Sequence, residues 1–146
     1  MTAVTVPAGA KVALPFTEIA RRIAAAELPR VDLVIGVATG GVVPAALLAY
    51  RLGVPLARFD INYRAPDNSP RRPAPELLAA PSLPQAGTRV LLVDDVTVSG
   101  QTLGLARALL AGCEVTTLAL KGRGADIVLF PEVASCVAWP WHARPD

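Results

Sequence analysis

The sequence feature that most constrains the fold is a set of short apolar runs separated by segments with helical spacing. The runs at residues 32–37, 89–94 and 114–120 are rich in Val, Leu and Ile and carry no charged residue in their interiors. Such runs are typical of strands buried on both faces of a parallel sheet. Because strands here alternate with helices, we expect an α/β fold with an open, mostly parallel sheet flanked by helices.

The spacing of apolar residues predicts the remaining elements. Ile19 and Ile23 recur at helical spacing after Pro15, and Gly53 and Gly112 are suited to end helices. Helices are expected at 16–26, 42–52 and 101–111, and further strands at 56–61 and 133–138. The carboxyl ends of parallel strands are where ligands bind in such sheets, so residues at 38–42, 94–102 and 121–126 are expected to converge there.

A proline-rich stretch at 63–87 interrupts this pattern. It contains six of the chain's 14 prolines and offers at most a short helix around 76–80. A loop longer than about 12–15 residues inside a compact domain is either a functional lid or a floppy insertion. Because 146 residues suffice for one core, we expect a single domain over 1–146, with 63–87 as a flexible lid and 122–146 as a small C-terminal segment.

Composition excludes several classes of protein. A net charge of +2, without a basic cluster, argues against a nucleic-acid partner. No apolar run is long enough for a bilayer, and no signal pattern precedes the domain, so we expect a cytoplasmic protein without membrane contact. The two cysteines lie far apart, which argues against a disulfide scaffold. With only 18% charged residues, below the usual 25% or so, self-association into a homodimer or higher homo-oligomer is expected.

Residues 90–103 carry the chemistry. A buried strand ends in Asp94 and Asp95, and a small loop with Ser99 and Thr102 then leads into a helix. The helix N-terminus and the two hydroxyls suit a phosphate, whereas adjacent carboxylates suit the hydroxyls of a sugar and can help to hold Mg²⁺. An ordinary capped helix is the alternative for the loop alone. Acids and phosphate loop together predict a site for a ribose 5-phosphate.

The segment VLLVDDVTVSGQTL resembles the phosphoribosyl pyrophosphate (PRPP) motif of type I phosphoribosyltransferases, in which a strand and two acids precede a loop ending in T-G-x-T. Ser99 stands where Thr is commoner. Residues 33–54 are similar to the family's pyrophosphate loop and following helix. The small xanthine, guanine and hypoxanthine phosphoribosyltransferases of bacteria and archaea are the nearest in pattern, over about residues 16–142.

This resemblance implies roles for individual residues. Asp94 and Asp95 would act as the catalytic acids and take the ribose hydroxyls, with Asp95 also contacting Mg²⁺. The lid would close over the reacting centre, where Arg64, Arg71 or Arg72 could meet the pyrophosphate. The implied PRPP-binding residues are Thr39, Gly40, Gly41, Asp94, Asp95, Val96, Thr97, Val98, Ser99, Gly100, Gln101 and Thr102.

The implied base-binding residues are Val98, Lys121, Cys136 and Val137. Lys121 matches a lysine that contacts the exocyclic oxygen of 6-oxopurines. Cys136 replaces the family's stacking aromatic residue, so that stacking is either absent or supplied by Trp139 or Trp141, unless these are packing residues.

Three further positions depart from the family pattern. Val98 replaces an acid that accepts a proton from the base, whereas adenine-type relatives have a small apolar residue there. Thr39 stands where close relatives often have Arg, and His142 where they tend to have an acid; we interpret His142 as an exposed residue.

The resemblance implies Mg²⁺-dependent transfer of phosphoribose from PRPP to a purine, with a 6-oxopurine favoured. Two alternatives remain: a non-catalytic protein that binds PRPP or a nucleotide and regulates a partner, and a transferase for a non-purine acceptor. Val98, Thr39 and Cys136 motivate the first alternative.

Overall fold

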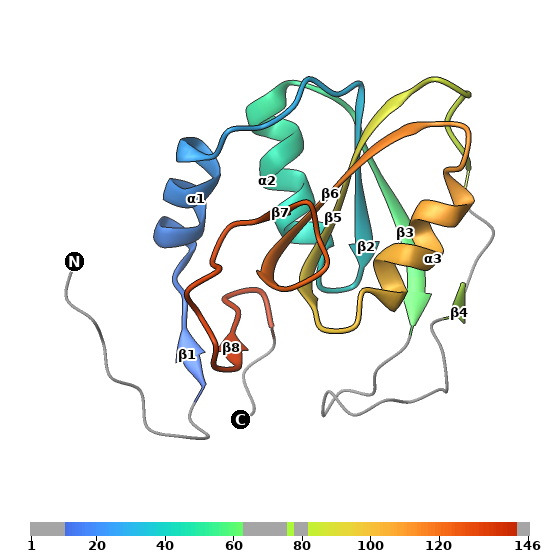
Figure 1. The fold of residues 1–146 in the computed structure, drawn as a ribbon. Helices are drawn as coiled ribbons and strands as arrows, with labels where there is room; N and C mark the ends of the chain where they lie inside the picture. Colours follow the sequence, from blue (N-terminus) through green and yellow to red (C-terminus); the bar gives the residue numbers. More distant parts are fainter. Residues whose placement is uncertain (1–10, 63–75, 78–81, 143–146) are drawn as a thin grey trace.

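The central feature of the structure, a computed structural model that describes residues 11–62, 76–77 and 82–142, is a six-stranded sheet (Figure 1). Its strand order is β4-β3-β2-β5-β6-β7. Five strands are parallel, and β4 pairs antiparallel with β3 at one edge. The strands are β2 (Leu33–Ala38), β3 (Leu56–Asn62), β4 (Glu76–Leu77), β5 (Arg89–Thr97), β6 (Glu114–Gly122) and β7 (Ile127–Val128). The expected open, mostly parallel α/β sheet is confirmed.

Helices cover both faces of this sheet (Figure 1). On one face, α1 (Phe16–Ala25) and α2 (Val42–Leu52) pack against alternate residues of β5 and β6. On the other face, α3 (Gln101–Leu109) packs against β2, β3 and the remaining residues of β5. Both cores are largely aliphatic, which explains why the strands are continuous apolar runs. Among the described residues, no helix is long and apolar enough to cross a membrane.

Local sequence signals explain the bounds of α1 and α2. Ile19 and Ile23 are the buried residues of α1, which is the amphipathic spacing that predicted it. Gly53 ends α2 with φ of 68° in the left-handed region, a conformation in which glycine is favoured. Its amide donates to the carbonyls of Ala49 and Tyr50.

A separate two-stranded sheet joins segments from the two ends of the described chain. β1 (Val12–Ala13) pairs in parallel with β8 (Val137–Ala138), and the two lie side by side below α1 (Figure 1). The amide of Val12 donates to the carbonyl of Cys136 at 2.8 Å.

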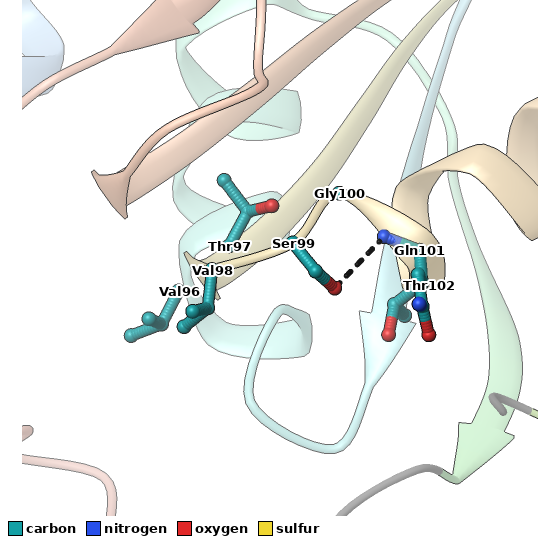
Figure 2. Close-up of a pocket in the computed structure, with 7 residues that line it drawn as sticks. All are labelled: Val96, Thr97, Val98, Ser99, Gly100, Gln101 and Thr102. Carbon is teal, nitrogen blue, oxygen red and sulfur yellow. Dashed lines mark hydrogen bonds between the residues drawn. The ribbon is translucent and has the colours of Figure 1, made fainter. Parts of the chain in front are cut away.

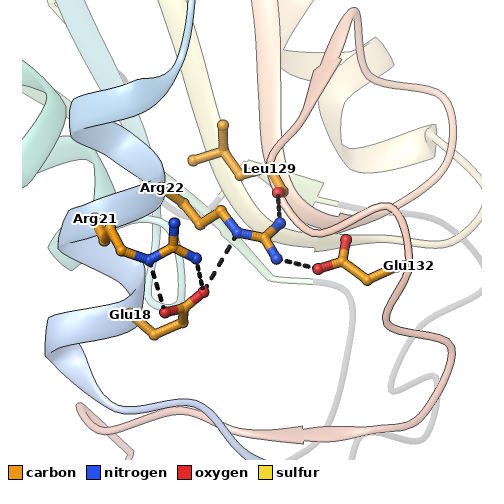
Figure 3. A network of polar contacts seen from close by, with 5 residues as sticks. All are labelled: Glu18, Arg21, Arg22, Leu129 and Glu132. Atoms are coloured by element: carbon orange, nitrogen blue, oxygen red, sulfur yellow. Dashed lines mark hydrogen bonds and ion pairs between the residues drawn. The ribbon is translucent and has the colours of Figure 1, made fainter. Parts of the chain in front are cut away.

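Arg22 fastens the segment between β7 and β8 to α1 (Figure 3). Its guanidinium donates to the carbonyl of Leu129 at 2.6 Å and pairs with Glu132. It also lies 4.4 Å from the ring centroid of Phe130, a cation–π distance. On the helix itself it lies 3.4 Å from a carboxylate oxygen of Glu18.

Several expected bounds are wrong. β5 continues to Thr97 rather than ending at residue 94, because its pairing with β6 extends to Thr97 opposite Gly122. The helix expected to reach residue 111 ends at Leu109. Only Val137–Ala138 of the strand expected at 133–138 forms, and it pairs outside the main sheet.

Residues 76–77 form a strand instead of the start of a short helix. The predicted lid falls mainly on residues 63–75 and 78–81, which lie outside the described residues, as do Arg64, Arg71 and Arg72.

Candidate functional site

Three chain segments meet at the carboxyl ends of β2, β5 and β6. The turn after β2 lies against Asp95, since a Cβ added to Gly40 would come within 2.3 Å of Oδ2 of that residue. The end of β6 lies against the loop after β5: the amide of Arg123 donates to the carbonyl of Thr97 at 3.0 Å, and a Cβ on Gly122 would collide with the same carbonyl. The expected convergence is confirmed up to this point.

Beyond Gly124 the chain turns back and leaves the site. The carboxylate of Asp126 accepts hydrogen bonds from the amide and the hydroxyl of Thr117, at 2.9 and 3.1 Å. Asp126 therefore lies beside the middle of β6, and not at its carboxyl end as expected.

The two acids differ in their environments although they are adjacent. Asp94 is buried, with 8% of its surface exposed, and burial together with the neighbouring Asp95 raises the pKa of Asp94 well above its usual range. The side chain of Asp95 is 17% exposed. Asp94 Oδ1 accepts from the amide of Asp95, and Asp95 Oδ1 accepts from the amide of Val96, both at 2.8 Å. Asp95 thus presents Oδ2 to the site.

A small pocket follows the acids (Figure 2). Its lining is one continuous segment: Val96, Thr97, Val98, Ser99, Gly100, Gln101 and Thr102.

The backbone of this pocket is shaped by Gly100, which precedes α3 with φ of 78° and makes no side-chain cap. The hydroxyl of Ser99 accepts from the amide of Gln101 at a long 3.4 Å. The N-cap residue is Gly100, so neither Ser99 nor Thr102 occupies that position, and Ser99 accepts only from the first helix amide. The next amides of the helix remain suited to an anion. Every residue of the pocket is uncharged.

Val98 is 62% exposed although it is apolar. Figure 2 shows it pointing to the same side of the loop as Val96. The position at which the family pattern has an acid is therefore an exposed apolar side chain within the pocket wall.

Of the predicted base-binding residues, only Val98 lines this pocket. Lys121 is half-buried and lies beside Val96 in the β5–β6 register. Cys136 is exposed, whereas Val137 is buried in the core on the α1–α2 face. None of these three lines the pocket, so the structure places Lys121 beside Val96 at the start of the loop but does not bring all three to one cavity.

The two tryptophans pack against each other. Trp139 is 4% exposed and belongs to the core, and its ring stacks on that of Trp141 at 5.2 Å between centroids. The ring of Phe16 lies beside that of Trp141, with 6.0 Å between the two ring centroids. Trp139 is therefore a packing residue in this structure.

His142 is exposed, as expected from the sequence, but it also lies beside Asp95, which the sequence did not indicate. Its Nε2 is 3.9 Å from Asp95 Oδ2. No motif spacing signals this contact, because the two residues lie far apart in the chain.

The acids fit a divalent cation only in partnership with a ligand. The described residues contain no group of three or more His, Cys, Asp or Glu side chains placed to hold a metal. Mg²⁺ commonly binds through one or two carboxylates together with substrate phosphates, and Asp95 offers one such carboxylate.

Comparison with known proteins identifies relatives. A family model described as the phosphoribosyl transferase domain matches residues 14–139. The purine phosphoribosyltransferase of Pyrococcus horikoshii has a similar structure, with a TM-score of 0.76, 26% identity, and coverage of 93% of this chain and 97% of that chain.

Two further structures show the same fold at lower identity. The xanthine-guanine-hypoxanthine phosphoribosyltransferase of Helicobacter pylori has a TM-score of 0.70, 14% identity, and coverage of 90% and 94%. A hypothetical protein of Neisseria gonorrhoeae with bound ppGpp has a TM-score of 0.67, 22% identity, and coverage of 91% and 89%.

Proposed function

Since the chain belongs to the phosphoribosyl transferase domain family, we propose that it transfers the 5-phosphoribosyl group of PRPP to a purine base and releases pyrophosphate. The observation that carries this proposal is the junction of the acid pair with two loops. The turn at Gly40 lies against Asp95, and the uncharged loop at 96–102 begins directly after it. In this proposal the pyrophosphate of PRPP contacts the turn at Gly40, its ribose contacts the acid pair, and its 5′-phosphate contacts the loop at 96–102.

The residues act by positioning and electrostatics. The loop amides and the hydroxyls of Ser99 and Thr102 bind the 5′-phosphate, and the Thr39–Gly40 backbone binds the pyrophosphate. Asp94 and Asp95 accept hydrogen bonds from the ribose hydroxyls. A ring nitrogen of the base then attacks C1′ as the bond to pyrophosphate breaks, and the site holds the two reactants in line.

Mg²⁺ fits this arrangement, with Asp95 as the protein ligand. When bound, the ion would neutralise charge on the departing pyrophosphate. Removal of the ion with EDTA should abolish turnover while leaving the binding of ribose 5-phosphate measurable by calorimetry.

A purine acceptor is supported by two observations, and a 6-oxopurine by one of them. Lys121 lies beside Val96 at the end of β6, where an ammonium can donate to an exocyclic oxygen. The Pyrococcus horikoshii neighbour is a purine phosphoribosyltransferase. Val98 supplies no proton acceptor to the base, so the base is expected to react without help from that position.

A panel of adenine, guanine, hypoxanthine, xanthine and orotate tests the proposal by pyrophosphate release from PRPP and Mg²⁺. Turnover with a purine supports it, and turnover with orotate alone would assign a non-purine acceptor. If no base reacts although PRPP binds in a calorimeter, the protein is a binding regulator, which the exposed apolar Val98 favours. A variant carrying both Asp94→Asn and Asp95→Asn should lose PRPP binding; intact binding would refute the placement of the ribose.

We further propose that the protein is a cytoplasmic homo-oligomer. Tyr50 on α2 is 90% exposed, and Leu56 at the start of β3 is 43% exposed, so each leaves side-chain surface that a second copy of the chain could cover. Sedimentation equilibrium would reveal the oligomer, and a monomer at micromolar concentration would contradict it.

A further inference from the structure

His142 is held beside the acid pair by its neighbours in the chain. Its amide donates to the carbonyl of Trp139 at 3.1 Å, and its ring lies nearly perpendicular to that of Trp141, with 6.3 Å between ring centroids and 78° between planes. Trp141 in turn stacks on Trp139, which is anchored in the core. The imidazole is therefore held by contacts with two packed tryptophans, although 52% of its side-chain surface is exposed.

The separation between His142 and Asp95 is the informative quantity. At 3.9 Å, Nε2 and Oδ2 are too far apart for a direct hydrogen bond. They are close enough for one oxygen atom to lie about 2.8 Å from each of them. Asp95 Oδ1 already accepts from the amide of Val96, so Oδ2 is the oxygen that is open to such a bridging atom.

The chemistry of the two groups selects the kind of oxygen that can bridge them. An ionised carboxylate only accepts hydrogen bonds, whereas an imidazole with its proton on Nε2 donates there. A bridging oxygen must therefore donate to Asp95 and accept from His142. A hydroxyl group or a water molecule does both, whereas an anionic phosphate oxygen has no hydrogen to donate. At a site that receives a ribose, a sugar hydroxyl can take the place of the water.

We propose that His142 and Asp95 share one ribose hydroxyl of the substrate, with the hydroxyl donating to Asp95 Oδ2 and accepting from His142 Nε2. His142 is then a binding residue that recognises the sugar, supplied by the C-terminal segment rather than by the phosphate loop. This inference rests on the proposed function, because that function brings the ribose to Asp95.

The test combines variants of His142 with ligands that lack single hydroxyls. His142→Leu removes the donor, and His142→Gln retains an N–H donor on a side chain of similar length. The probes are ribose 5-phosphate, 2-deoxyribose 5-phosphate and 3-deoxyribose 5-phosphate, measured by calorimetry in EDTA so that no metal mediates the contact. Near-ultraviolet circular dichroism, which reports Trp139 and Trp141, confirms that the variants are folded.

For ribose 5-phosphate, we expect His142→Leu to weaken binding about tenfold, the effect of one hydrogen bond of about 1.4 kcal/mol. His142→Gln should recover most of this loss. With the deoxy analogue that lacks the bridged hydroxyl, the Leu variant and the unmodified protein should bind equally well.

An equal loss for all three ligands, or no loss for any, would overturn the inference and leave the proposed function standing. If the unmodified protein binds none of the three, the proposed function fails together with the inference.

Discussion

Substitution of Gly40 by Ala should disable the site without unfolding the protein. The added Cβ would lie 2.3 Å from Asp95 Oδ2 and 2.6 Å from Oδ1, whereas ordinary contacts begin near 3.4 Å. The carboxylate must therefore move by about 1 Å, and such a movement breaks the 2.8 Å hydrogen bond that Oδ1 accepts from the Val96 amide. Misplacement of a reacting group by about 1 Å can cost roughly a hundredfold in rate.

Gly40 is suited to this experiment because the obstacle is the end of a side chain. The neighbouring Gly41 is not, since its Cβ would meet backbone carbonyls of β2 and β5. Gly104 on α3 provides the matched control, because a Cβ there meets no atom within 4 Å. Gly104→Ala should raise stability by up to about 1 kcal/mol through helix propensity and leave activity unchanged.

The assay is pyrophosphate release under saturating PRPP, together with the calorimetric affinity for ribose 5-phosphate. Gly40→Ala should lower kcat/KM for the base about a hundredfold and weaken the binding of ribose 5-phosphate. The urea midpoint should stay close to that of the unmodified protein. Activity within threefold of the unmodified protein would refute the claim that the turn at Gly40 fixes the position of Asp95.

Three further outcomes are expected. Arg22→Met should destabilise the fold by about 2–3 kcal/mol in urea titration, because the variant loses a charged hydrogen bond to a backbone carbonyl and a cation–π contact. The adjacent Arg21→Met, on a side chain that is 57% exposed, should leave the urea midpoint nearly unchanged, and equal shifts for the two variants would contradict this. Asp94→Asn should raise the urea midpoint at pH 7 and have little effect below about pH 4. The pKa of the Asp94 carboxyl is raised by burial, so the folded protein loses stability as the pH rises above the pKa of this carboxyl in the unfolded chain. An unchanged midpoint at pH 7 would refute the burial argument. Val98→Asp should increase turnover with hypoxanthine or guanine at least about tenfold and not with adenine, and a gain with adenine would refute a 6-oxopurine pocket.

The elements that were predictable from sequence are those whose signals are local. The bounds of α2 were predicted correctly, because its apolar spacing is followed by Gly53, whose left-handed backbone ends the helix. Asp94 and Asp95 could be singled out together with the loop at 96–102 because these residues are contiguous in the chain, and the structure places that loop directly after the two acids. The end of β5 was not predicted correctly. This strand continues to Thr97 because it pairs with β6 up to that residue, and the sequence of one strand does not show how far its partner extends.

Contacts between residues far apart in the chain could not be predicted either, because they depend on the partner segment as well. β1 and β8 are two residues long each, too short for any periodicity to be detected. The approach of His142 to Asp95 depends on how Trp139 and Trp141 pack, which a pattern of residue types does not encode.

The small sheet of β1 and β8 has a practical consequence for work with this protein. Among the described residues, β8 has no strand partner other than β1, so Val12 and Ala13 supply the backbone pairing of the segment whose side chains Val137 and Trp139 are buried in the core. A tag or fusion that replaced residues 1–10 and disturbed this pairing would therefore be expected to loosen the segment that carries His142, although β1 is remote from residues 96–102 in sequence. A tag in that position is expected to change ligand affinity, and its removal before assays should be part of every measurement.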